Sequence, residues 1–354
     1  MILKLNRLIR QLRRKKGVSL GLLLVVLLGS FVGNALTFYF FDRGSQPDLK
    51  LLDAFWYSMV SITTIGYGDF SATSAGARIG TAIFVVLLGL AAFTSAIGIG
   101  VDWMLDVQHK ARTGTGSPRV SDHLLVINFP NERRVLQIVE EFLQDPGHRT
   151  REIVIVTDRI ETLPFVSHNI HFVRGSPLEE ETYQRASVLR ARQAMVLSTG
   201  YDDPNSDSVA ASIVSILEHL NSEIRSIVEC LNATHTVLFR GAKNVSLVYT
   251  FRMSNNLLVQ EAQDPGVNKL TQAITSNQIE GTLVSTRVEG GVDRSLPYRD
   301  VAKRLLDHDV NLVGVLRDGN VHVRFNALAL VENDRLVYIC STRHDWPTLR
   351  SLLG

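Results

Sequence analysis

The sequence predicts an α-helical membrane domain with two spans, followed by an α/β domain built on a doubly wound parallel sheet. Two uncharged apolar runs, at 18–41 and 79–101, are long enough to cross a membrane. At about 1.5 Å per residue, either run would span a hydrocarbon core of about 30 Å as a helix. Behind them, short β-branched runs alternate with helical patterns, which is typical of parallel sheets. With 45% apolar residues and only two cysteines in 354 residues, disorder and a disulfide scaffold are excluded.

The charges predict how the chain lies in the membrane. Basic residues crowd the start of the chain, at positions 4, 7, 10 and 13–16, so we expect 1–17 to form a cytoplasmic N-terminus. Two spans return the chain to that side, which predicts a multi-pass protein of the cell (inner or plasma) membrane with both termini cytoplasmic. A cleaved signal peptide is disfavoured, because the apolar run is too long and positions 38–41 are aromatic rather than small.

The same charges indicate a lipid bilayer as the partner, and no nucleic acid. Residues 1–119 carry a net charge of +7, and the remainder carries −5. The basic cluster lies next to a membrane span, whereas the part behind the spans is acidic and would repel phosphates.

The stretch at 42–78, between the spans, is strongly patterned. Its segment 51–62 is apolar and aromatic and about half as long as a membrane span, so we expect a re-entrant helix. A Gly-Tyr-Gly sequence follows at 66–68, where glycine allows backbone conformations that other residues resist. Irregular backbone at membrane depth persists only when it is buried in protein or lines a water-filled path.

Thr64-Ile65-Gly66-Tyr67-Gly68 resembles the potassium-channel selectivity filter, with isoleucine where the commonest version has valine. The resemblance implies that the carbonyls of residues 64–67, with the Thr64 hydroxyl, replace the hydration shell of K⁺ as the permeant ion. Asp69 would lie behind the outer mouth. Because one chain supplies one filter strand, a homotetramer is implied, with a pore domain at 18–102 and a pore helix and filter at 51–69. The alternative is a chance Gly-Tyr-Gly turn in an extracellular loop.

Gating is expected to come from outside the membrane. Neither span carries regularly spaced arginines, so we expect no voltage sensor. Gly89, Gly98 and Gly100 in the second span are candidate hinges, since glycine absorbs backbone change cheaply, and resemblance to two-helix channels favours Gly89. The alternative is that Gly89 only permits close helix packing. We expect residues 103–121 to be a linker.

The part behind the linker resembles the RCK domain (regulator of K⁺ conductance) over roughly residues 122–350. Residues 172–177 followed by a helix at 179–186 look like that family's strand, turn and helix. The resemblance implies a Rossmann-like N-lobe at 122–250, crossover helices that pair subunits at 251–278, and a small α+β C-lobe at 279–354. The predicted strands are 124–127, 152–158, 170–173, 194–197, 225–228, 312–316 and 336–339, and the predicted helices are 132–144 and 208–220.

A nucleotide site would have to depart from the usual form. The dinucleotide-binding turn needs Gly-x-Gly-x-x-Gly, whereas residues 128–133 read Asn-Phe-Pro-Asn-Glu-Arg without a glycine. The usual NAD pose is therefore disfavoured, but an adenine nucleotide held differently stays open. The candidate ligand-binding residues are Asn128, Asn131, Asp158 and Arg174. Asp158 ends the second strand, where an acid can bind ribose hydroxyls. Arg133 and Arg134 are further sources of positive charge.

Calcium is the other ligand that the resemblance implies, because calcium-gated relatives bind it with acids on the fourth and fifth strands. Glu229 matches one acid of the fifth strand, but Leu231 replaces the second, and the fourth strand ends near Ser198 without an acid. Asp203 and Asp207 are weaker metal candidates. Capping of the helix at 208–220 explains Asp207 without a metal.

We find no catalytic set and expect no enzyme: the histidines lack metal-ligand spacing and no nucleophile motif occurs. The function predicted is a potassium channel in which a ligand on the RCK domain moves the linkers and opens the pore. Soluble RCK subunits started at Met104 would complete an octameric ring. The alternatives are a potassium transporter component regulated by a nucleotide-binding RCK domain, and a membrane-tethered dehydrogenase.

Overall fold

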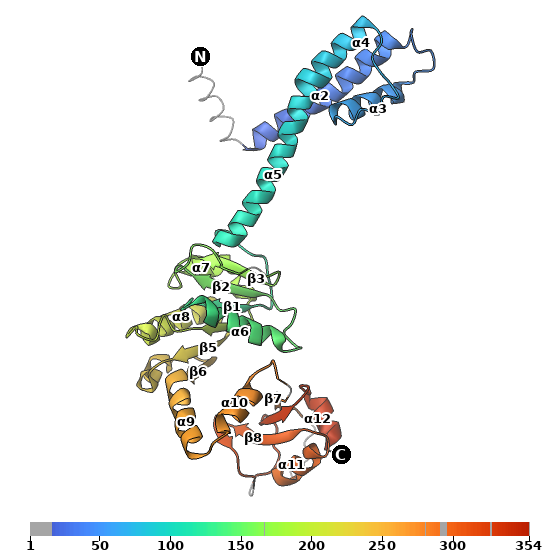
Figure 1. Ribbon diagram of the computed structural model, residues 1–354. Helices are drawn as coiled ribbons and strands as arrows, with labels where there is room; N and C mark the ends of the chain where they lie inside the picture. Colours follow the sequence, from blue (N-terminus) through green and yellow to red (C-terminus); the bar gives the residue numbers. More distant parts are fainter. Residues whose placement is uncertain (1–15, 166, 280, 291–295, 326–327, 354) are drawn as a thin grey trace. The chain divides into compact units, whose positions relative to one another are not determined.

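The computed structural model describes residues 16–165, 167–279, 281–290, 296–325 and 328–353 (Figure 1). The chain divides into two compact units, Met1–His109 and Lys110–Gly354. Each unit has its own hydrophobic core.

All regular secondary structure in the described part of the first unit is helical. Its elements are α2 (Lys16–Asp42), α3 (Leu51–Ile62), α4 (Ala75–Gly80), the π-helical segment η1 (Thr81–Gly89) and the start of α5 (Leu90–Thr113). Two helices, Gly21–Asp42 and Ala75–Thr113, are long and apolar enough to span a membrane. Their side chains are mostly exposed in the single chain, as expected of surfaces that face lipid or other chains.

The second long helix extends further than the sequence predicted. We expected a linker from residue 103, but α5 remains helical to Thr113. Residues 103–113 contain no glycine or proline, so nothing stops the helix where its apolar run ends. The helix ends before Gly114, which has a left-handed φ of +64°.

The second unit begins with a parallel sheet of six strands. The order is β3-β2-β1-β4-β5-β6, which is the doubly wound arrangement, and every neighbouring pair is parallel. The bounds are β1 Leu124–Ile127, β2 Ile153–Thr157, β3 Ile170–Arg174, β4 Gln193–Val196, β5 Arg225–Cys230 and β6 Val245–Tyr249. In the central register Leu124 pairs with Ile153 on one side and with Gln193 on the other.

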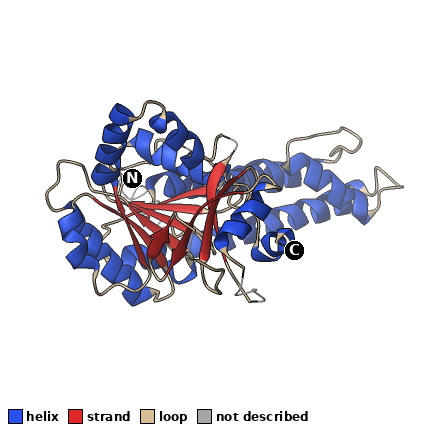
Figure 2. Cartoon of the chain, turned by 90° about the horizontal axis from the view of Figure 1, so that it is seen from below, coloured by secondary structure: helices blue, strands red, loops and turns tan. Residues whose placement is uncertain are grey.

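Helices cover both faces of this sheet, as the helices beside the strands in Figure 2 show. Alternate residues of β1 and β2 point to opposite faces, and each face has its own apolar cluster. Helix α6 (Glu132–Gln144) packs on one face, and α7 (Glu180–Arg185), the 3₁₀ turn η2 (Val188–Arg190) and α8 (Ser206–Leu220) pack on the other. The predicted Rossmann-like fold is confirmed.

Two helices and a small lobe complete the second unit. Helices α9 (Thr250–Gln263) and α10 (Val267–Thr275) bury no residue within the chain and leave Met253, Leu258 and Leu270 more than half exposed. The C-lobe has a four-stranded antiparallel sheet in the order β7-β10-β8-β9. Its elements are β7 Thr282–Arg287, α11 Tyr298–Leu306, β8 Asn311–Arg317, β9 Asn320–His322, β10 Arg335–Cys340 and α12 Trp346–Leu352, and η3 (Ala233–Phe239) precedes β6.

Candidate functional site

The segment behind α3 has an unusual backbone. Thr64, Gly66 and Gly68 have positive φ angles of +62°, +59° and +78°, so every second residue is left-handed. The end of the helix holds the start of this segment, because Ile65 N and Gly66 N both donate to Val60 O, at 3.0 and 3.3 Å. Within the described residues, no hydrogen bond is accepted by the carbonyl oxygens of residues 64–67. These oxygens are therefore available to water, ions or other chains.

Aromatic side chains hold the far end of the segment on α3. Trp56 Nε1 donates to Asp69 Oδ2 at 2.8 Å. The rings of Trp56 and Tyr67 stack with an interplanar angle of 3° and centroids 5.8 Å apart. Tyr67 is 66% exposed in the single chain. The structure thus places the predicted residues 64–69 in one irregular segment that follows α3 and is held against it.

Gly89 lies where three helices come close together. A Cβ atom at this position would lie 2.7 Å from Phe84 O, 2.7 Å from Ser30 Oγ of α2 and 2.9 Å from Ile62 Cγ1 of α3. No side chain fits there without movement of its neighbours, so the glycine does permit close packing. Its role as a hinge stays a prediction.

In the second unit, the carboxyl ends of β1 and β4 form the point where the sheet's connections change direction. In doubly wound sheets, ligands bind in the crevice at this point. Asn128, directly after β1, is left-handed at φ +73°, and its amide Nδ2 donates to Leu197 O at 2.8 Å. The side chain therefore bridges the ends of β1 and β4, where a glycine turn would leave room for a pyrophosphate. Asn131 caps α6 by accepting from Arg134 N at 2.9 Å.

An ion pair with a buried glutamate lies at the same end of the sheet, next to Ser198 behind β4. Arg134 Nη2 of α6 lies 2.6 Å from Glu229 Oε1 of β5, and Ser198 N donates to Glu229 Oε2 at 2.8 Å. Burial raises the pKa of Glu229, but the hydrogen bonds from Arg134 and Ser198 outweigh it and hold that pKa below its ordinary value. The glutamate is therefore ionised at neutral pH and neutralised by Arg134.

The ion pair connects to helix α9 through aromatic rings. The Arg134 guanidinium lies over the Tyr201 ring, 5.0 Å from its centroid. Tyr201 in turn contacts Phe251 of α9, with centroids 5.3 Å apart. Sequence reasoning named Arg134 only as a source of charge. Nothing in the sequence pairs it with Glu229, which lies 95 positions away.

The two other ligand candidates lie outside this cluster. Asp158 is exposed at the end of β2. Arg174 ends the edge strand β3, which β2 separates from β1, and its guanidinium lies 3.7 Å from Glu161 Oε1. Its backbone N–H donates to Gly114 O at 2.8 Å. Arg174 therefore ties the segment behind α5 to the sheet, away from the crevice.

The two metal candidates each have hydrogen-bond donors as partners. Asp203 accepts from the Thr199 hydroxyl and from Asn205 N. Helix α8 begins at Ser206, so Asp207 lies in its first turn, and the predicted capping role is wrong. The Asp207 carboxylate instead accepts from the loop behind β5, at Leu231 N, Asn232 N and His235 Nδ1. No group of three or more potential ligands from His, Cys, Asp and Glu occurs in the described part of the chain.

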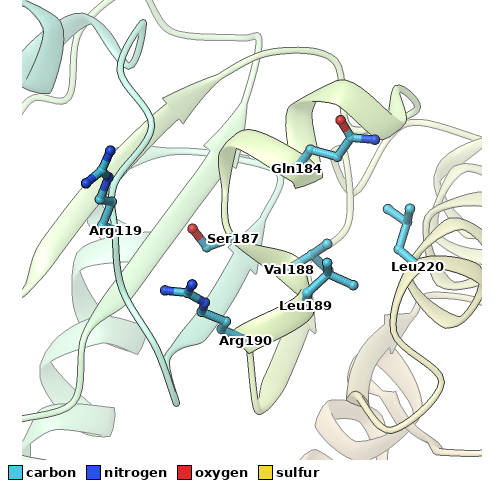
Figure 3. A pocket seen from close by; sticks show the side chains of 7 residues that line it. All are labelled: Arg119, Gln184, Ser187, Val188, Leu189, Arg190 and Leu220. Atoms are coloured by element: carbon cyan, nitrogen blue, oxygen red, sulfur yellow. The ribbon is translucent and has the colours of Figure 1, made fainter.

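A cavity of about 570 Å³ lies elsewhere in this unit, beside the segment that leads into β1 (Figure 3). In the view, Arg119 and Arg190 flank Ser187. The lining consists of Arg119, Gln184, Ser187, Val188, Leu189, Arg190 and Leu220. With two arginines and no acid, this lining favours anions. Sequence reasoning did not reveal the cavity, because three separate segments contribute to it.

Two family models match the chain, one to each unit. A model described as an ion channel matches residues 21–106. A model of the calcium-activated potassium channel slowpoke-like RCK domain matches residues 119–235. Neither model matches the C-lobe.

Among curated proteins, YugO of Bacillus subtilis, which carries a potassium-channel name, is 22% identical over 272 residues, covering 75% of this chain and 79% of that protein. The calcium-gated potassium channel TvoK of Thermoplasma volcanium is 21% identical over 312 residues, covering 86% and 85%. Both relatives are named as channels rather than enzymes.

Solved structures with a similar fold include the human SLO3 gating ring, with a TM-score of 0.49 and 14% identity over 64% of this chain. The GsuK channel bound to NAD has a TM-score of 0.46 and 16% identity over 95% of this chain. The chain covers 44% and 59% of those two solved chains, less than two thirds of either. An ion-channel model on the first unit, an RCK model on the second and potassium channels as relatives along most of the length together show a potassium channel with an RCK regulatory domain, homologous to gated potassium channels.

Proposed function

We propose that this channel is a homotetramer in the cell membrane, in which residues 64–68 of four chains surround the path of K⁺. The observation that carries the proposal is the row of carbonyl oxygens at 64–67, which accept no hydrogen bond within the described residues, combined with a left-handed backbone at every second position. Carbonyl rings of this kind replace the hydration shell of K⁺. The exposure of residues 64–69 in the single chain supports their covering by other copies.

The pore is gated by a ligand bound at the crevice of the RCK sheet, and we propose an adenine nucleotide rather than Ca²⁺. Calcium needs several free oxygen ligands, but Glu229, Asp203 and Asp207 already accept hydrogen bonds from protein donors. The guanidinium of Arg134, whose side chain is 19% exposed, is the charge that a phosphate can reach. A phosphate would compete with Glu229 for Arg134 and disturb its contact with Tyr201 and, through it, α9.

Gating requires that the nucleotide binds the open and closed arrangements with different affinity, because a ligand with equal affinity shifts nothing. The basic N-terminus and the even number of spans support cytoplasmic termini, where nucleotides are abundant. Soluble RCK subunits from an internal start at Met104 would extend the ring to eight RCK domains. The chain acts as a channel, without catalysis of its own.

The ligand is tested by recording single channels in planar bilayers while ADP, NAD(H) or Ca²⁺ is added to the RCK side. We expect the nucleotide to change the open probability of the wild-type channel, and Ca²⁺ to leave it unchanged. Arg134→Gln should abolish the nucleotide response. The double variant Arg134→Gln/Glu229→Gln, which leaves no buried charge unpaired, should lose it as well while folding normally.

Arg119→Gln is the matched control, because it removes an arginine from the other basic cavity of the same unit. It should keep the nucleotide response. If only Arg119→Gln loses the response, the nucleotide binds in that cavity and not at Arg134. A Ca²⁺ response of the wild-type channel would overturn the choice of ligand. The K⁺ current itself tests the pore independently of either result.

A further inference from the structure

The second membrane helix changes its hydrogen-bonding pattern in the middle of the span. Between Thr81 and Gly89 it is π-helical, and Leu90 N donates to Val85 O, five residues back rather than four. Compared with an α-helix, such a segment accommodates an inserted residue. π-helical segments are rare, and they occur frequently at functional sites.

A side chain from another helix holds this segment. The hydroxyl of Ser30, on α2, donates to the Phe84 carbonyl in the middle of η1. Ser30 is 1% exposed, so water does not compete for the bond. An external hydroxyl that enters the backbone ladder of a helix is a recognised cause of a local departure from α-helical geometry.

Two glycines fix Phe84 against the neighbouring helices. The Phe84 ring lies on Gly33 of α2, where a Cβ atom would be only 2.6 Å from the ring. At Gly89 a Cβ atom would meet Phe84 O, Ser30 Oγ and Ile62 Cγ1 within 2.9 Å. Ile62 is the last residue of α3, directly before the segment proposed to be the filter. The outer helix, the re-entrant helix and η1 therefore meet at Ser30.

We propose that Ser30 is a positioning residue that keeps η1 in its π-helical form, and that release of its hydrogen bond lets η1 become α-helical and turns α5 about its axis. Removing an insertion of one residue corresponds to a turn of about 100°. The turn changes which face of α5 lines the K⁺ path, next to the end of the re-entrant helix. The inference rests on the proposed function, because it assigns the turn to the opening and closing of that pore.

The test compares thiol accessibility in the wild-type channel and in Ser30→Ala. Single cysteines are placed at positions 91–94, and their modification by a water-soluble thiol reagent is followed through the K⁺ current. The native cysteines are silent, since both are buried and burial raises the pKa of Cys230 to about 11. In Ser30→Ala we expect a changed open probability and a reactive position moved by one residue toward the N-terminus.

A second variant deletes Val86. The deletion removes the inserted residue, so η1 can become α-helical while α5 keeps its present orientation. This variant should keep the wild-type pattern of reactive cysteines, and adding Ser30→Ala to it should change nothing further. Ser95→Ala is the matched control, since that hydroxyl bonds within its own helix, to Ala91 O. It should behave as wild type.

Unchanged open probability and an unchanged reactive position in Ser30→Ala would overturn the proposal. So would a Val86 deletion in which Ser30→Ala still moves the reactive position. If Ser30→Ala fails to assemble, the Val86 deletion alone decides: it should hold the open probability constant when ligand is added, and normal ligand gating would contradict the proposal. Absence of K⁺ current in the wild-type channel would instead count against the proposed function.

Discussion

Gly66 is the residue on which the backbone of the proposed filter depends most directly. It has φ +59°, where a side chain costs about 1–2 kcal/mol. We expect Gly66→Ala to distort the row of carbonyls and to lower the preference of the current for K⁺ over Na⁺, measured as a shift in reversal potential. Gly29→Ala in α2, where nothing lies within 4 Å of the added Cβ, should conduct as wild type.

The Arg134–Glu229 pair predicts a difference between single and double substitutions. Arg134→Met leaves the carboxylate of Glu229, 4% exposed, without its countercharge, and should destabilise the fold by about 3 kcal/mol. In a unit of this size that lowers the midpoint of thermal unfolding by about 6–12 °C. Arg134→Met/Glu229→Met should recover most of the loss. Equal midpoints for wild type and Arg134→Met would show that the pair is not buried as described.

Single residues also mark the limit of sequence reasoning. Asp207 precedes a helical run and is a good cap by local rules, but two backbone N–H groups and His235 behind β5 take its carboxylate instead. Local spacing cannot reveal partners that lie far along the chain. Glu229 was singled out through family resemblance, whereas its arginine partner became visible only in the folded chain.

At the scale of elements, β1 begins beside a buried histidine whose titration should affect stability. His123 is fully buried, and burial lowers its pKa below the ordinary value of about 6.5, although its Nε2 lies 3.0 Å from Ala186 O. The groups around it are His171, Asp122 and Glu152. The unfolded chain therefore binds a proton that the folded chain does not, once the pH falls below about 6.5. Stability should then fall by up to about 1.4 kcal/mol per pH unit from this group.

The expected result is a flatter pH dependence of unfolding in His123→Gln below about pH 6.5, measured by thermal unfolding of the full chain. His168→Gln is the control, because His168 is exposed and should keep the wild-type slope. Equal slopes in wild type and His123→Gln would mean that other groups account for the acid sensitivity.

Elements with a clear hydrophobic pattern of their own were predicted with the correct first and last residues. Elements that depend on contacts with distant parts of the chain were not. The apolar run that makes α3 and the amphipathic pattern that makes α6 have the bounds expected from sequence, Leu51–Ile62 and Glu132–Gln144. Strand β6 was missed because it lies at the edge of the sheet with every residue half-buried, which leaves no clear alternation. The π-helical form of η1 was also unpredictable, since its stabilising contact comes from Ser30, 54 positions away.

At the scale of the whole molecule, the internal start proposed at Met104 predicts a second product. Translation from Met104 would give a shorter chain that lacks both spans and the filter segment, beside the full chain of 39.4 kDa. We expect both bands on a denaturing gel of the expressed protein, and only the larger band from Met104→Leu. Met104 lies in α5, so this conservative change should leave the helix intact. A smaller band that persists in Met104→Leu would rule out this start.

The division into a membrane unit and an α/β unit was visible in the sequence, because hydropathy and β-branched periodicity depend on composition and local order alone. The doubly wound strand order followed from the alternation of strands and helices together with family resemblance. How the units cooperate depends on contacts between chains, which composition and local order do not encode.

Selection of K⁺ by residues 64–68 is best tested by the reversal potential of a single channel in a planar bilayer. With K⁺ on one side and Na⁺ on the other, we expect the current to reverse close to the equilibrium potential of K⁺, and this preference to be lost in Gly66→Ala. A wild-type current that reverses near zero under the same gradient would show that residues 64–68 do not select K⁺.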